Sequence, residues 1–115
     1  MTLGVGIVPI NAGPFIGPGF LTEFGKLAED LGFESLWTFE HVVVPEQYNS
    51  VYPYNPSGKL SLSGAVECVD PLIALSFVAA VTQRLKLGTG VNILTQANPL
   101  YLAKQASSID HLSGG

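Results

Sequence analysis

Strand-length apolar runs alternate with amphipathic helical segments along the chain, and this alternation restricts its fold more than any other feature. Three apolar runs have the length and residue types of strands, at residues 3–8, 35–39 and 85–90. Three segments repeat apolar residues at three- and four-residue steps and are predicted helices, at residues 20–31, 71–83 and 99–112. Strands that alternate with helices of this length form parallel sheets with right-handed crossovers.

The predicted helices have recognisable ends. Asp70-Pro71 and Asn98-Pro99 each combine an N-cap residue, whose side chain accepts backbone hydrogen bonds, with a proline at the first helical position. Gly32 follows the first predicted helix, where a left-handed residue commonly ends one. These signals place the helix boundaries independently of the apolar pattern.

Two architectures fit this order of elements: an open, doubly wound sheet and a (β/α)₈ barrel. Periodicity alone does not separate them. The open sheet often carries a GxGxxG turn after its first strand, but residues 8–13 read VPINAG and do not match. In both architectures, ligands bind at the carboxyl ends of the strands.

Composition narrows the class of protein. Charged residues make up 12% of the 115 residues, about half of the usual fraction, so part of the surface is expected to be covered by more protein. Five basic residues, a net charge of −4 and no basic cluster argue against nucleic-acid binding. We find no membrane-spanning run, signal peptide or metal-ligand spacing, and the single cysteine, Cys68, forms no internal disulfide. These features predict a cytoplasmic protein.

His41 is the candidate catalytic residue, because it directly follows the second predicted strand. An imidazole titrates near neutral pH and can transfer a proton beside a reacting ligand. Alternatively, His41 braces the base of the loop that follows it. Glu40 either orients His41 or has a structural role, and we favour the structural role because neighbouring strand residues face opposite sides.

A long irregular excursion at residues 46–66 is typical of a functional loop. Its tyrosines could line a lid or pack on the rim of the sheet: Tyr48, Tyr52 and Tyr54. Trp37 and Phe39 belong to the second predicted strand and are expected in the core.

The chain resembles the luciferase-like monooxygenase family. The resemblance rests on LGFESLW (31–37), FEH (39–41), DPL (70–72), AAVT (79–82), RLKLGTGV (84–91), NP (98–99), AKQA (103–106) and DHLSGG (110–115). These blocks cover almost the whole chain in the family's order. EHVVVP (40–45) and YPY (52–54) are similar to the branch that uses the deazaflavin coenzyme F420.

This resemblance implies a (β/α)₈ barrel that binds a small-molecule substrate and a reduced cofactor, F420 or alternatively FMN, for hydride transfer or oxygen activation. It implies that His41 is catalytic, and we expect four residues to bind the cofactor: Ile10, Gly90, Val91 and Asn92. It also implies a cis peptide or a bulge at Gly90-Val91 in the complete barrel.

A complete barrel needs about 250 residues, and this chain has 115. We therefore expect residues 1–115 to be the N-terminal part of one barrel domain, with only the first three βα units. We also expect the chain not to be a stable monomer, but to associate with another copy or with the rest of the barrel. The alternative function is a catalytically inactive barrel fragment that binds itself or a partner.

Overall fold

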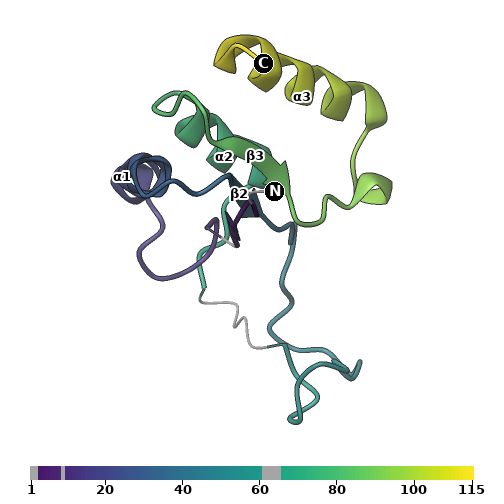
Figure 1. Ribbon diagram of the computed structural model, residues 1–115. Coiled ribbons are helices and arrows are strands. Elements are labelled where there is room, and N and C mark those ends of the chain that lie inside the picture. Colours follow the sequence, from purple (N-terminus) through teal and green to yellow (C-terminus); the bar gives the residue numbers. More distant parts are fainter. Residues whose placement is uncertain (1–2, 9, 61–65) are drawn as a thin grey trace.

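The computed structural model describes residues 3–8, 10–60 and 66–115, which form an α/β structure with one parallel sheet (Figure 1). Its elements are β1 (Gly6–Ile7), α1 (Pro18–Asp30), β2 (Ser35–Thr38), α2 (Pro71–Ala79), β3 (Lys86–Thr89), the 3₁₀ turn η1 (Leu94–Gln96) and α3 (Pro99–Ser113). The strands lie in the order β1-β2-β3, and both neighbouring pairs are parallel. The predicted order of strands and helices is confirmed.

Both Asx-Pro helix starts are confirmed. The Asp70 side chain accepts hydrogen bonds from the backbone N–H groups of residues 72 and 73. Asn98 does the same for residues 100 and 101. The first helix begins at Pro18, two residues before the predicted start, with this proline in its first turn and Gly17 as N-cap.

The second helix is shorter than predicted, and Glu29 explains where it ends. The Glu29 carboxylate accepts the backbone N–H groups of Gln83, Arg84 and Leu85 at 2.8, 2.5 and 3.0 Å. These N–H groups therefore bond to α1 rather than extending α2 beyond Ala79. The contact with the Arg84 N–H, followed by that with Gln83, lowers the pKa of Glu29.

Helices α1 and α2 cover one face of the sheet. The core lies between them and the strands, and consists of Ile10, Leu21, Ala28, Leu36, Ala74, Leu75, Val78 and Leu85. At Gly25 the two helices approach closely, since an added Cβ would lie 2.8 Å from a methyl carbon of Val78. The side of the molecule formed by α1, α2 and this sheet face therefore contains an apolar core.

Trp37 lies on the opposite face of the sheet, where its indole spans the two neighbouring strands. Added Cβ atoms at Gly6 and Gly88 would lie 2.9 and 2.7 Å from the Trp37 side chain, so both glycines make room for the ring. The indole N–H donates to Ser35 Oγ at 2.9 Å. Trp37 is 37% exposed, so its prediction as a core residue is wrong. The reason is that no described element packs over this face.

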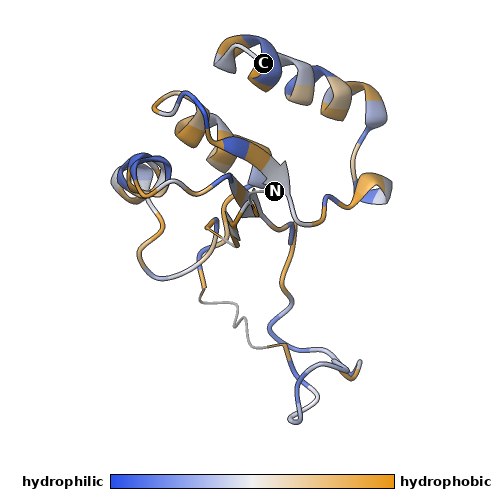
Figure 2. Cartoon of the chain, viewed as in Figure 1, coloured by the Kyte–Doolittle hydropathy of each residue, from blue (hydrophilic) through white to orange (hydrophobic). Residues whose placement is uncertain are grey.

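Helix α3 lies beside α2 (Figure 1) and contacts it. None of its residues is buried. Figure 2 shows apolar residues along its length. A hollow of about 530 Å³ lies between α3, α2 and the free edge of β3. Within the described part of the chain, no helix is long and apolar enough to cross a membrane.

Candidate functional site

The carboxyl ends of the three strands lie at one edge of the sheet, because all strands are parallel. Beyond the last paired residues, the Gly90 N–H donates to the Thr38 carbonyl at 2.5 Å. This bond holds the start of the segment after β3 against the end of β2. The segments that follow the three strands therefore begin close together, as the sequence predicts.

Asn11 connects the segment after β1 to both ends of the connection between β2 and α2, from a fully buried position with 0% of its surface exposed. Its Nδ2 donates to the Phe39 and Val69 carbonyls at 2.7 and 2.8 Å. Its Oδ1 accepts the Phe39 N–H at 3.0 Å, and its own carbonyl accepts the Val69 N–H at 2.9 Å. The sequence alone assigns no role to Asn11. The available signal is an amide side chain a few residues after an apolar strand.

Glu40 joins the segment after β2 to the segment after β3. Its carboxylate accepts a hydrogen bond from the Ile93 N–H, next to η1. This contact supports the structural interpretation of Glu40. It also fixes the separation of the two segments that border the hollow described next.

A shallow hollow of about 310 Å³, which we call the edge hollow, lies between these two segments. It is lined by His41, Val42, Val43, Ile93 and Gln96. His41 is half-buried, and its ring makes an edge-to-face contact with Phe39 at a centroid distance of 5.3 Å. A flat ligand in this hollow would therefore contact apolar side chains and one imidazole.

Cys68 lies in the segment that leads back from the excursion to α2, beside the backbone N–H of His41. Burial raises the pKa of the Cys68 thiol, and the hydrogen bond from the His41 N–H partly opposes this rise. Cys68 also forms an isolated bridge with Ala12. The neutral thiol is therefore favoured, and Cys68 acts as a small packing residue.

The four expected cofactor-binding residues follow β1 and β3, and none of them is among the residues that line the edge hollow. Gly90 and Val91 are exposed, and Asn92 is half-buried with an Oδ1 atom that is buried and has no hydrogen-bond partner. Ile10 is 2% exposed and packs in the core, so its side chain offers a ligand almost no surface. No cis peptide occurs among residues 3–8, 10–60 and 66–115. The cis bond expected at Gly90-Val91 concerns the complete barrel and stays a prediction.

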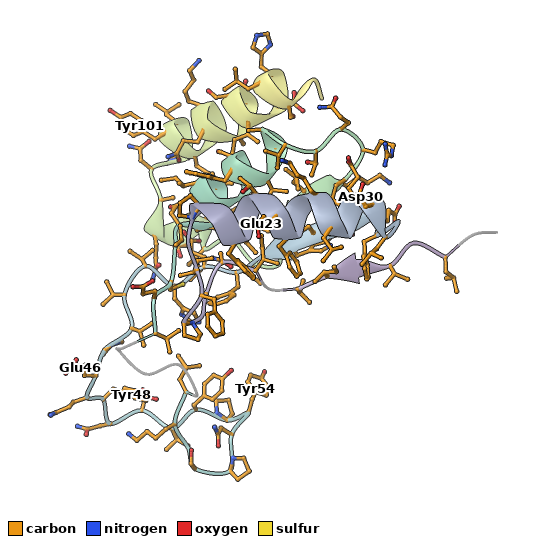
Figure 3. All side chains as sticks on the ribbon, turned by 90° about the vertical axis from the view of Figure 1, so that its left-hand side faces the viewer. Glu23, Asp30, Glu46, Tyr48, Tyr54 and Tyr101 are labelled. Carbon is orange, nitrogen blue, oxygen red and sulfur yellow. The ribbon has the colours of Figure 1, made fainter. Side chains whose placement is uncertain are left out.

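The described part of the excursion is organised around its own aromatic residues and projects away from the sheet (Figures 1 and 3). The Lys59 ammonium lies 4.3 Å above the Tyr48 ring and donates to the Tyr48 carbonyl at 2.6 Å. Tyr52 and Tyr54 make an edge contact at 5.7 Å. The residues that line the edge hollow come from outside this stretch. In this structure the three tyrosines therefore pack locally and form no lid over the hollow.

Residues 3–115 match the family model described as luciferase-like monooxygenase. The match includes the His41 segment, the Gly90–Ile93 segment and all three helices. The chain belongs to the luciferase-like monooxygenase family. The resemblance seen in the sequence is confirmed.

Individual members of the luciferase-like family agree with this assignment. An uncharacterized protein of Mycobacterium tuberculosis (strain ATCC 25618 / H37Rv) is 32% identical over 90 residues, which are 78% of this chain and 32% of the relative. The alkanal monooxygenase alpha chain of Photorhabdus luminescens is 23% identical over 96 residues, 84% of this chain and 21% of that protein. The 4-hydroxyprotoasukamycin monooxygenase of Streptomyces nodosus subsp. asukaensis is 29% identical over 93 residues, which are 81% of this chain and 20% of that protein. The chain spans about a third or less of these relatives' lengths.

Proposed function

We propose that this chain forms the first three βα units of a (β/α)₈ barrel oxidoreductase and that its edge hollow receives the ring of a reduced flavin or deazaflavin. The observation that carries the proposal is the position of the hollow. It lies at the carboxyl edge of a parallel sheet, where barrel enzymes bind their ligands, and it places His41 beside apolar walls.

The residues at this edge fit such a ring. Asn92 directly precedes Ile93, which lines the hollow, and its buried Oδ1 has no hydrogen-bond partner within the described residues. A ring N–H group is the donor that we propose for this atom. Val42, Val43 and Ile93 supply apolar contacts for a flat heterocycle. Gly90 is exposed and carries no side chain that would obstruct the ring.

When bound, the reduced ring supplies a hydride or activates oxygen. This chain's own residues have different tasks in the proposed mechanism. Gly90, Val91 and Asn92 lead into Ile93, which lines the hollow, and would hold the ring at that margin, while His41 would donate or accept a proton at the substrate side. Glu40 keeps the two bordering segments at a fixed separation through its bond to Ile93. Ile10 supports the site from the core beneath.

We propose F420 as the cofactor, with FMN as the alternative. The support for F420 is the EHVVVP and YPY segments at residues 40–45 and 52–54. The two monooxygenase relatives support oxidation chemistry in general. A small organic molecule is the proposed substrate.

Replacement of His41 tests its role. In the complete gene product, His41→Asn is expected to lower turnover by about 10²–10⁴-fold, the usual contribution of a general acid or base. Cofactor affinity should change little. Steady-state kinetics, cofactor titration and a thermal melt on the same variant separate this role from a structural one. Unchanged turnover at saturating substrate would remove His41 from the mechanism.

A partner-binding module is the second candidate function, because α3 has no buried residue and, among the described strands, β3 pairs only with β2. A free strand edge pairs readily with another strand. Under this hypothesis the 115-residue chain associates with a second copy in solution. A monodisperse monomer with cooperative unfolding, measured by light scattering and denaturation, would exclude it.

A further inference from the structure

The side chain of Asn11 continues the sheet beyond the point where β1 leaves it. The paired residues of β1 and β2 are Gly6 with Ser35 and Ile7 with Leu36. Past this point the backbone of Phe39 still needs a donor and an acceptor. A primary amide offers both, as a peptide group does. Asn11 accepts the Phe39 N–H and donates to the Phe39 carbonyl, so it replaces the missing strand backbone.

The same residue also holds the point where the chain returns from residues 40–68. The second N–H of the Asn11 amide donates to the Val69 carbonyl, and the Asn11 carbonyl accepts the Val69 N–H. Phe39 and Val69 are the residues that flank this segment. One buried side chain therefore fixes both of its ends relative to β1.

Few other residue types could make the same hydrogen bonds as Asn11 at this position. Both N–H groups donate, the oxygen accepts, and the residue is fully buried. An aspartate has nearly the same shape but donates nothing when ionised, so it would face two carbonyl oxygens. A buried acceptor that loses its donor carries a desolvation cost, and the backbone is expected to shift to relieve it.

His41 lies close to both Phe39 and Val69, the two residues that Asn11 holds. It lies two residues after Phe39, whose ring it contacts, and its backbone N–H lies beside Cys68, the residue before Val69. We infer that Asn11 is a positioning residue for His41, which it places at the edge hollow by fixing Phe39 and Val69. This inference rests on the proposed function of His41. It also assigns the bracing of the loop base to Asn11 rather than to His41.

The test compares Asn11→Asp in two backgrounds of the complete gene product. Alone, Asn11→Asp is expected to lower turnover by roughly 10²-fold, the typical effect of misplacing a catalytic group by about 1 Å. In the His41→Asn background the same change should lower turnover less than about threefold, because residues that act through one another are not additive. Asn49→Asp is the matched control, since it makes the same change at an exposed asparagine within the segment 40–68 that Asn11 holds. It should leave turnover unchanged.

Amide hydrogen exchange gives a second measurement that does not depend on a folded variant. In the unmodified protein, the Phe39 and Val69 amides should exchange as slowly as those of β2, because Asn11 binds both. Fast exchange at these amides, or an equal loss of turnover in both backgrounds, would overturn the inference. If His41→Asn alone left turnover unchanged, the proposed role of His41 would fail and the positioning inference would fail with it, while slow exchange would still show that Asn11 holds Phe39 and Val69. Asn11 would then hold the loop without serving catalysis.

Discussion

The two sides of this molecule differ in how completely they bury their apolar residues. The side formed by α1, α2 and the adjacent sheet face contains the whole described core. On the other side, α3 has no buried residue, and Trp37 lies 37% exposed on the second face of the sheet. Helix α3 thus carries apolar residues and buries none of them. The comparison shows which part of the described chain contains a core and which part does not.

Replacing one apolar residue on each side should give the largest difference. Leu36 is 0% exposed in the core, and Leu36→Ala should cost about 2–5 kcal/mol of unfolding free energy. Ile109 lines the hollow beneath α3, and Ile109→Ala should cost the 115-residue chain less than about 1 kcal/mol. In the complete gene product the cost of Ile109→Ala should rise. Urea denaturation measures the unfolding free energy of both variants in the 115-residue chain and in the complete gene product. If Ile109→Ala lowered it equally in the two, the proposed difference between the two sides would be wrong.

Two glycines of α1 test how tightly the covered side is packed. An added Cβ at Gly25 would lie 2.8 Å from Val78, so Gly25→Ala should destabilise the protein by about 1–3 kcal/mol. Gly19 has open space around it, so Gly19→Ala should stabilise by about 0.5–1 kcal/mol through helix propensity. The melting temperatures should therefore move in opposite directions. A rise with Gly25→Ala would show that α1 and α2 separate easily.

Glu29 should make the covered side sensitive to acid. Its folded-state pKa is lowered from 4.5, first by the Arg84 N–H and then by the Gln83 N–H. A lowered pKa gives stability that is present above the unfolded-state pKa and is lost as the pH falls through the folded-state pKa. The difference in unfolding free energy between the unmodified protein and Glu29→Gln should therefore shrink toward acid pH. Glu23→Gln changes the same charge at an exposed position of α1 and should show a weaker dependence.

The sequence predicted the parallel order because that order follows from local signals. Asp70-Pro71 and Asn98-Pro99 place two helix starts without reference to distant residues. The Glu29 contact was not predictable in the same way, because it joins residues more than 50 positions apart and ends α2 early. Asn11 is similar, with bonds that span 28 and 58 positions. Residue spacing carries no information about such contacts.

The candidate site also has a part that local signals predict and a part that depends on long-range contacts. His41 was found because it directly follows a strand, and strand ends share one edge of a parallel sheet. The bond between Glu40 and Ile93, which shapes the edge hollow, depends on where two loops meet. Trp37 was misjudged because strand membership alone does not tell which sheet face is covered.

Cofactor binding at the edge hollow tests the central claim most directly. Complete gene product is titrated with reduced F420 and with reduced FMN under anaerobic conditions, and fluorescence or absorbance reports binding. The variant Val43→Trp fills the hollow, and Val51→Trp is its control, since both valines are exposed but only Val43 lines the hollow. We predict saturable binding of F420, or alternatively FMN, that is weakened at least tenfold by Val43→Trp and is unchanged by Val51→Trp. Failure of both cofactors to bind, or equal binding by the two variants, would contradict this account.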